Sequence, residues 1–322
     1  MRPDPPRRQE RAARRAARAS PVPVALPSQE TNVRMDSPDR RMVSDYNRGV
    51  HPVVRLGHFA AYEVRQWWGH IAHPDRIHWA LPVVLATAAF FVLFPWDLEI
   101  SRAARSIRLG GDVRREFETW QQYGQGVSMV VAALFIWILD PARRRRLLDL
   151  GMAALATVLV VNILKMTIGR PRPKFDDAET FLWPTGMYPL EHDGHKFLAH
   201  AWDLGKPISS DLWSMPSSHT AYAVVLSLFL AALYPKLRWL VWPMAVFVGV
   251  PRVVTGGHWA TDVVWGAAVG YIFARPAVYE LWGVRLIDWI WVRFVDRHAR
   301  MCLPEVLATE GTRGGRVDAR FE

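Results

Sequence analysis

The sequence predicts an all-α fold, a bundle of six transmembrane helices that follows an interfacial helix and a disordered, arginine-rich tail. Two observations carry this prediction. The mean hydropathy of the 322 residues is +0.01, but that average conceals several long uncharged runs between arginine-rich ends, the profile of a multi-pass membrane protein. The single cysteine, Cys302, excludes an intrachain disulfide framework, and no Cys and His residues have the spacing of a structural zinc site.

Two segments are expected before the membrane domain. Residues 1–50 predict a disordered basic tail, because its first part is mainly Arg, Ala and Pro and cannot bury enough apolar surface to fold. The tail lacks the interleaved aromatic residues that would stack on bases, so no nucleic-acid partner is expected. No apolar run follows its arginines that would make it a signal peptide. Residues 51–76 predict an amphipathic helix in the membrane interface, and a helix packed on the bundle is the alternative.

The membrane domain is expected at residues 77–284, where six apolar segments are long enough, or nearly long enough, to cross a bilayer. The last two give the weaker signals, because the fifth is short and contains Pro243 whereas the sixth carries Arg275 and Glu280. Arg275 can still snorkel to the membrane surface at the end of a span. In chain order the six segments are residues 77–96, 126–139, 147–168, 218–234, 237–251 and 262–282.

Arginines predict the orientation of these spans. The densest cationic run, residues 143–146, lies in the short loop between the second and third spans, and such loops are typically cytoplasmic. Both termini, including a C-terminal tail at 285–322, are then cytoplasmic. The loop at 97–125 argues the other way, because it would be external and yet holds five arginines. The excess of Arg over Lys is typical of a GC-rich bacterial genome, so the plasma (inner) membrane of a bacterium is the expected location.

Polar segments lie at the ends of the predicted spans. The third span ends in KMTIGRPRP, from Lys165 to Pro173, which places fixed cations at the membrane edge, where phosphate is their natural ligand. The fourth span opens with PSSH, from Pro216 to His219, whose hydroxyls, backbone N–H groups and imidazole predict an anion site at a helix N-terminus. Each segment alone has a plainer explanation, as basic residues that end a span or as a helix N-cap.

The third polar segment lies between the fifth and sixth spans and reads PRVVTGGHWATD, from Pro251 to Asp262. If the stretch after Gly257 is helical, His258 and Asp262 lie one turn apart on one face. The carboxylate can then hold one imidazole N–H and make the other ring nitrogen a better nucleophile. A structural hydrogen bond between the two side chains is the alternative. With the spans above, all three polar segments fall on the same side of the membrane.

Together these segments, within residues 147–275, resemble the type-2 phosphatidic acid phosphatase superfamily, membrane lipid phosphatases that share their motifs with vanadium haloperoxidases. The family pattern is K-x6-RP, then PSGH, then SR-x5-H-x3-D. The first motif matches fully at Lys165, Arg172 and Pro173. Ser218 replaces the glycine of the second motif and Pro251 replaces the serine of the third, while the other motif positions match.

The resemblance implies a metal-independent phosphoryl transfer in two steps, without a cofactor. It implies that His258 is the nucleophile and forms a phosphohistidine, that Asp262 orients it, and that His219 is first the general acid and then the base. Because Pro251 lacks both a hydroxyl and an N–H, phosphate binding at that corner is expected to be weaker than in the family. The phosphate-binding residues that the resemblance implies are Lys165, Arg172, Ser217, Ser218 and Arg252.

Residues 174–214 form a long connection between the first and second motifs. Its length predicts a lid or a substrate-selecting loop over the site, and a solvated loop is the alternative. A metal site built from His192, His195 and His200 is a further alternative, although their spacing suits no standard pattern.

These inferences predict an integral-membrane phosphatase that acts on a lipid phosphate or diphosphate monoester at the external, periplasmic face of the membrane. The substrates that the resemblance suggests are phosphatidic acid, phosphatidylglycerophosphate, an undecaprenyl diphosphate and a lipid A phosphate. One alternative is a lipid-to-lipid phosphotransferase, and another is a non-catalytic lipid-phosphate-binding protein, which Ser218 and Pro251 motivate. A soluble vanadate-dependent haloperoxidase is a third, and the uncharged spans argue against it. The sequence predicts no oligomeric state.

Overall fold

The structure is a computed structural model that describes residues 79–107, 110–204 and 209–296, together with Leu303 and Val306. The expected basic tail at 1–50 and interfacial helix at 51–76 lie outside the described residues. The expected C-terminal tail at 285–322 begins inside a helix, because α12 spans Trp282–Ile290 and a π-helical turn continues it over Trp291–Val295.

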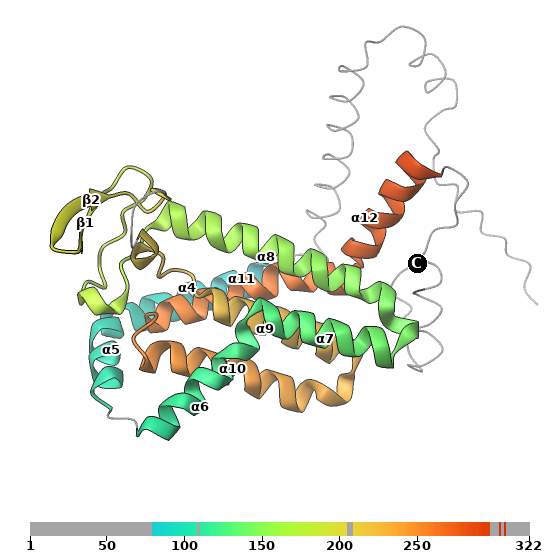
Figure 1. Ribbon diagram of the computed structural model, residues 1–322, viewed down its shortest axis with the longest axis horizontal. Helices are drawn as coiled ribbons and strands as arrows, with labels where there is room; N and C mark the ends of the chain where they lie inside the picture. Colours follow the sequence, from blue (N-terminus) through green and yellow to red (C-terminus); the bar gives the residue numbers. More distant parts are fainter. Residues whose placement is uncertain (1–78, 108–109, 205–208, 297–302, 304–305, 307–322) are drawn as a thin grey trace, which may run out of the picture. The chain divides into compact units, whose positions relative to one another are not determined.

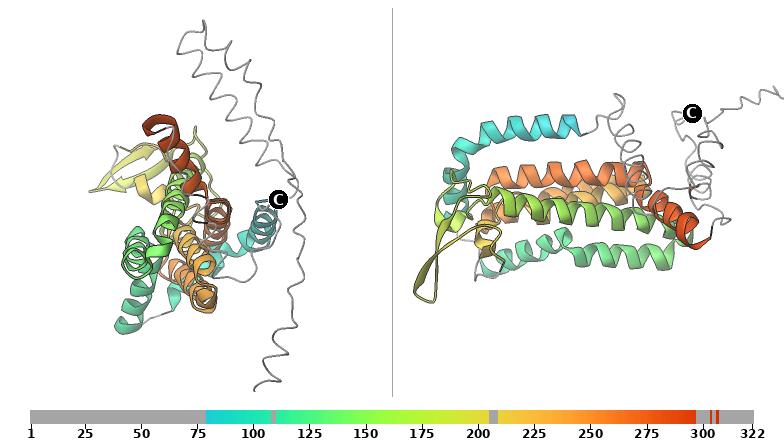
Figure 2. Two further views of the ribbon diagram at one scale, coloured as in Figure 1. Left: turned by 90° about the vertical axis from the view of Figure 1, so that its right-hand side faces the viewer. Right: turned by 90° about the horizontal axis from the view of Figure 1, so that it is seen from above.

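Helices α7 to α11 run side by side and form the bundle (Figures 1 and 2). Helix α9 lies among α8, α10 and α11 and packs against all three, while α4 packs along α11. The sequence of α9 is apolar on every side, as its central place requires. The bounds are α4 Ala80–Leu93, α5 Asp97–Ser106, α6 Gly111–Gln121, α7 Gly126–Leu139, α8 Leu147–Ile168, α9 Ser218–Leu233, α10 Arg238–Val254 and α11 Ala260–Tyr279.

Three helical stretches of the described chain are long and apolar enough to cross a membrane: Ala80–Ser106, Pro141–Ile168 and Pro235–Val254. The pair Gly111–Gly124 and Gly126–Leu139, bent by 63°, makes a fourth if it counts as one span. Helix α9 is apolar but shorter, and α11 carries Asp262, Arg275 and Pro276. Composition and length therefore support three or four of the six expected spans.

The outward faces of the long helices carry large apolar side chains. Phe91 of α4 is 71% exposed, Leu139 of α7 is 74% exposed and Trp239 of α10 is 78% exposed. A water-soluble protein rarely leaves so many such side chains in contiguous surface, so these faces fit lipid. The interior is packed around α9, where Val225, Leu226 and Phe229 are almost fully buried.

Two expectations about secondary structure are corrected. The expected external loop at 97–125 is mostly helical, because α5 and α6 occupy it; Asp97 and Glu99 in the first turn of α5 and Arg105 in its last turn complement the helix dipole. The all-α expectation misses an antiparallel hairpin, β1 Tyr188–His192 and β2 His195–Ala199. Its two-residue turn, Asp193-Gly194, has φ values of 49° and 78°, the left-handed region that such tight hairpin turns need.

Close approach of α9 and α11 determines where the site lies. Gly266 and Gly270 of α11 face α9, and a Cβ atom at either position would come within 2.4 Å of the carbonyl oxygen of Ser217 or Ala221. Only glycine allows this contact. The N-terminus of α9 is thereby held against the first turns of α11.

Candidate active site

The three motif segments meet at one end of the bundle, where α8 and α10 end and α9 and α11 begin (Figure 1). Helix α8 ends at Ile168, and the next residue, Gly169, has a φ of 59° and turns the chain toward Arg170 and Arg172. Ser217 is the N-cap residue of α9 and its N–H donates to the carbonyl of Asp262 at 3.0 Å, which joins the second motif to the third.

Three cations lie near the imidazole of His219. The positive charges of Arg252, Lys165 and Arg172 all act on this side chain. Lys165 is only 6% exposed, and its Nζ donates to Ser218 Oγ at 3.2 Å. Such a concentration of partly buried cations is costly without an anion, so the group can bind a phosphate.

The two arginines of this cationic group are positioned by neighbouring backbone and side-chain oxygens. Arg172 Nη1 donates to the carbonyl of Gly257 at 3.3 Å, and Arg252 Nη1 donates to Gln121 Oε1 at 2.5 Å. The Nε of Arg252 is buried and has no hydrogen-bond partner among the described residues. A buried donor of this kind is costly unless a ligand accepts from it.

The imidazole of His258 is almost fully buried, and the carbonyl of Ser214 accepts from its Nδ1 at 2.6 Å. Because a carbonyl can only accept, the proton lies on Nδ1 and the lone pair lies on Nε2. Burial lowers the pKa of His258 to about 3, so the imidazole is neutral at neutral pH. This is the state that a nitrogen nucleophile needs.

Asp262 lies beside His258 but does not make the hydrogen bond expected from the sequence. Its Oδ2 is 3.7 Å from Nδ1, too far for a hydrogen bond, and the Ser214 carbonyl takes that position. Helix α11 begins at Ala260, so His258 precedes the helix, and Asp262 approaches it because its Oδ2 accepts from the N–H of Trp259 at 2.9 Å. The carboxylate therefore caps α11 and supplies negative charge near the imidazole.

The two departures from the family motifs have different local effects. Ser218 is the first residue of α9 and is not among the described residues with positive φ, so it needs none of glycine's backbone freedom. Its hydroxyl instead accepts from Lys165, a contact that glycine cannot make. Pro251 lies inside α10, is buried, and its carbonyl accepts from the N–H of Thr255 at 2.8 Å.

Four residues that hold this site in place were not predicted from the sequence. Gln121 holds Arg252, and Ser214 holds both His258 and Asp262, the latter through its Oγ at 2.5 Å. The other two, Arg170 and Asp97, form a buried ion pair beneath them. Asp97 follows an apolar span directly and Arg170 lies within the first motif, but neither position alone indicates a partner.

The described residues of the 174–214 segment form local structure at this end of the bundle (Figure 1). Leu182, Leu190, Ala199, Ala201 and Leu212 form a small buried cluster, and the hairpin is part of it. Arg172 is tied to the segment through the carbonyl of Ser210, which accepts from Nε at 3.1 Å. Within the part of the chain that the structure describes, no three His, Cys, Asp or Glu side chains are grouped as metal ligands. The alternative of a metal site at His192, His195 and His200 therefore gains no support.

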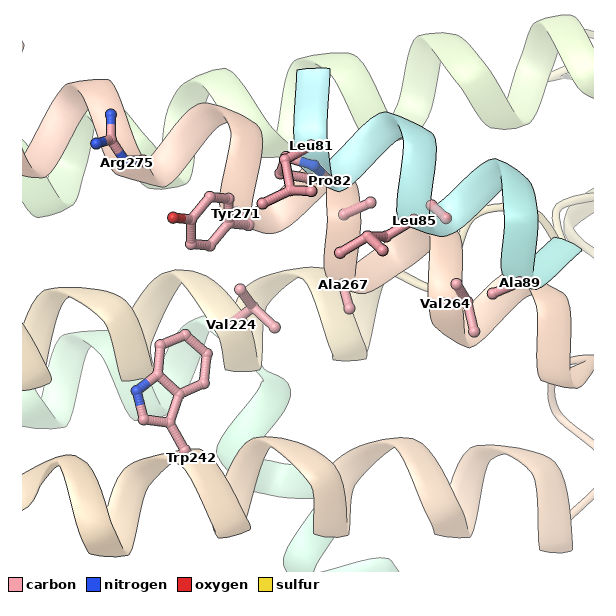
Figure 3. Close-up of a pocket in the computed structure, with 12 residues that line it drawn as sticks. Leu81, Pro82, Leu85, Ala89, Val224, Trp242, Val264, Ala267, Tyr271 and Arg275 are labelled. Carbon is pink, nitrogen blue, oxygen red and sulfur yellow. The ribbon is translucent and has the colours of Figure 1, made fainter. Parts of the chain in front are cut away.

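An apolar cavity of about 700 Å³ lies between α4, α9, α10 and α11 (Figure 3). Ala89 of α4 and Val264 of α11 line one part of it, and Trp242 of α10 lines its side. Tyr271 and Arg275 of α11 line its other part. The α11 residues that line it begin at Val264, two positions after Asp262. Apart from Trp242, Tyr271 and Arg275, the side chains that line the cavity are hydrocarbon.

Comparison with known proteins agrees with the motifs. Residues 146–285 match the model of the PAP2 superfamily. The predicted resemblance is confirmed. All three motif segments fall within the matched PAP2 region.

Curated relatives match over a limited part of the chain. A lipid A 1-phosphatase of Rhizobium johnstonii is 31% identical over 117 residues, which are 36% of this chain and 40% of that protein. An uncharacterized protein of Methanocaldococcus jannaschii is 32% identical over 103 residues, which are 32% of this chain and 39% of that protein. The chain thus spans about two fifths of the length of these relatives.

Two solved structures are similar in outline. A transmembrane PAP2-type phosphatidylglycerolphosphate phosphatase from Bacillus subtilis has a TM-score of 0.43 at 22% identity, covering 62% of this chain and 92% of that one. LpxE from Aquifex aeolicus has a TM-score of 0.41 at 21% identity, covering 56% of this chain and 94% of that one.

Proposed function

We propose that the protein is an integral-membrane phosphatase that hydrolyses a lipid phosphate or diphosphate monoester through a phosphohistidine intermediate. The observation that carries the proposal is the arrangement of His258, whose Nδ1–H is held by the Ser214 carbonyl and whose Nε2 bonds to no described residue. A buried neutral imidazole with a fixed tautomer, next to a group of three cations, suits nucleophilic attack on a phosphate.

The proposed reaction has two steps. In the first, the Nε2 lone pair of His258 attacks phosphorus and the P–O bond to the lipid breaks. His219, whose protonated form is favoured by the negative charge of the bound phosphate, donates its proton to the leaving oxygen. In the second, His219 removes a proton from water, the oxygen of that water attacks phosphorus, and the P–N bond breaks to release inorganic phosphate. Lys165, Arg172 and Arg252, with Ser217 and Ser218, stabilise the charge on the phosphoryl oxygens throughout. No step in this scheme needs a metal ion or a cofactor.

A lipid substrate is supported by the apolar surroundings of the site. The cavity along α11 extends by about 16 Å from Val264 to Arg275, given the rise of an α-helix. Hydrocarbon chains can occupy it while the phosphate lies among the cations. The lipid A 1-phosphatase of Rhizobium johnstonii is a relative with a substrate of this kind.

We propose that the chain crosses the membrane six times, with α6 and α7 together as one bent span. The ends of α8 and α10 and the beginnings of α9 and α11 then lie on the external face, and the site opens there. The arginines at 143–146 lie at the other end of the bundle, which supports a cytoplasmic position for that end. A bacterial inner membrane fits this arrangement.

The test is phosphate release from a panel of lipid phosphates by the purified protein in detergent with EDTA present. Wild type is compared with His258→Ala and with His195→Ala, a matched change at the hairpin turn. We expect release by wild type and His195→Ala and loss of at least a thousandfold in His258→Ala. Equal release by His258→Ala, or release abolished by EDTA, would overturn the proposed mechanism. Transfer of phosphate to a second lipid without free phosphate would instead indicate a phosphotransferase.

A further inference from the structure

Arg170 is fully buried at the end of α8, and described residues satisfy its guanidinium completely. Its Nε and Nη2 both donate to the carbonyl of Ala178, at 3.2 and 2.8 Å. Its Nη1 donates to Thr261 Oγ1 and to Asp262 Oδ1, each at 2.7 Å. Nη2 also donates to Asp97 Oδ2 at 2.9 Å. All donors face protein groups, so Arg170 is not placed to bind phosphate, unlike Arg172 two residues later.

Aromatic rings enclose the same guanidinium. The ring centroids of Phe94, Phe181 and Trp259 lie 5.5, 5.0 and 5.3 Å from Cζ of Arg170. A guanidinium stacked among rings and joined to two carboxylates is held in one geometry. Lysine could not reproduce this planar fork.

Asp97 extends the network to the first span. Its Oδ1 accepts from the N–H of Thr261 at 3.2 Å, and its Oδ2 accepts from the Thr261 hydroxyl as well as from Arg170. Asp97 is fully buried at the start of α5. It therefore fixes the N-terminus of α11 and the guanidinium of Arg170 together.

The hydrogen-bond network of Arg170 and Asp97 ends at His258, the proposed nucleophile. Arg170 occupies Oδ1 of Asp262, which leaves Oδ2 for the Ser214 hydroxyl at 2.5 Å and the Trp259 N–H at 2.9 Å. Ser214 is the residue whose carbonyl accepts from His258 Nδ1. If Asp262 were free to rotate, its Oδ2 could compete for that proton, since it lies only 3.7 Å away.

We propose that Arg170 and Asp97 are positioning residues for the reaction: through Asp262 and Ser214 they fix the tautomer and orientation of the His258 imidazole. This inference rests on the proposed role of His258 as the nucleophile. It predicts effects on the chemical step and little effect on substrate binding, because neither residue touches the phosphate.

The kinetic test compares Arg170→Lys and Asp97→Asn with wild type and with Arg114→Lys, a change at an exposed arginine paired with Glu118. We expect kcat to fall at least thirtyfold in Arg170→Lys and about tenfold in Asp97→Asn, with KM within threefold of wild type in both. Arg114→Lys should match wild type. Arg172→Lys should show the opposite pattern, with a raised KM. A kcat within twofold of wild type in both variants, with the proteins folded, would overturn the proposal.

A second measurement does not depend on turnover. The 15N chemical shifts of the His258 ring, assigned by their loss in His258→Asn, report which nitrogen carries the proton. We expect a single Nδ1–H tautomer in wild type and a mixture of tautomers in Arg170→Lys and Asp97→Asn. Unchanged shifts in both variants would overturn the positioning role. If wild type released no phosphate and the variants still showed mixed tautomers, the proposed function would fail while the positioning role stood.

Discussion

At the scale of single residues, the site depends on a backbone carbonyl. The carbonyl of Ser214 fixes the proton of His258 on Nδ1, while Asp262 is occupied by Arg170, the Ser214 hydroxyl and the Trp259 N–H. A carbonyl cannot be protonated at any ordinary pH, so this arrangement keeps Nε2 available over a wide range. The sequence predicted that His258 and Asp262 lie close together, but not that the carbonyl oxygen of Ser214 orients the His258 ring.

The lowered pKa of His258 predicts a specific dependence of stability on pH. Its pKa falls from 6.5 to about 3 because of burial, so the unfolded chain binds a proton that the folded chain does not bind between these values. The contribution to stability is complete above pH 6.5 and is lost as pH falls, by up to about 1.4 kcal/mol per pH unit. The melting-temperature advantage of wild type over His258→Asn in detergent should therefore shrink from pH 7.5 to pH 5. An advantage that is constant or grows on acidification would contradict this assignment.

At the scale of elements, the sequence predicted the helices that local composition determines. Long uncharged runs predicted α4, α7, α8 and α9 within a few residues, because an apolar run of that length has few other uses. The Asp193-Gly194 pair was a usable turn signal, yet the hairpin was missed because its strands are short and partly charged. Helices α5 and α6, within residues 97–125, were missed because their stability depends on contacts with α10. A local sequence pattern does not reveal such contacts.

Some residues of the candidate site can be predicted from local sequence and others cannot. The motif spacing indicated eight site side chains, and the three motif segments that carry them meet at one end of the bundle. Asp97 lies 73 positions before Arg170, and Gln121 lies 131 positions before Arg252, so only the packing of helices brings these pairs together. Their identities carry no signal that separates them from ordinary polar residues at the end of a helix.

The cavity beside α11 predicts a preference for long hydrocarbon chains. Ala267 lines it, so Ala267→Phe should fill part of the space and raise KM for a long-chain lipid phosphate about tenfold, equivalent to about 1.4 kcal/mol. Hydrolysis of the small ester p-nitrophenyl phosphate should stay within twofold of wild type. The matched control is Leu155→Phe on the exposed face of α8. Equal effects on both substrates would show that the cavity does not hold the chain.

At the scale of the whole molecule, a buried arginine connects the helices at each end of the bundle. At the end opposite the site, Arg146 pairs with Asp149 and donates to the carbonyl of Val278 at 2.6 Å. Asp149 in turn accepts from the N–H groups of Gly283 and Val284, at 2.9 and 3.1 Å. The arginine run at 143–146 is therefore partly structural, so the orientation it predicts needs an independent test.

Cysteine labelling tests that orientation. In a Cys302→Ser background, Asp193→Cys places a thiol at the hairpin turn and Ala142→Cys places one at the opposite end of the bundle. A membrane-impermeant maleimide added to intact cells, with the outer membrane made permeable where there is one, should label Asp193→Cys and leave Ala142→Cys unlabelled until the inner membrane is permeabilised. The reverse pattern would put the site on the cytoplasmic face.

The most direct test of the central claim is to trap the covalent intermediate. Wild type and His258→Ala are mixed with a lipid phosphate labelled in its phosphate, quenched within milliseconds in alkaline detergent and analysed by peptide mass spectrometry. The account predicts an acid-labile, alkali-stable phosphoryl group on His258 in wild type and no label in His258→Ala. A phosphoryl group on another residue, or turnover by His258→Ala at the wild-type rate, would contradict it.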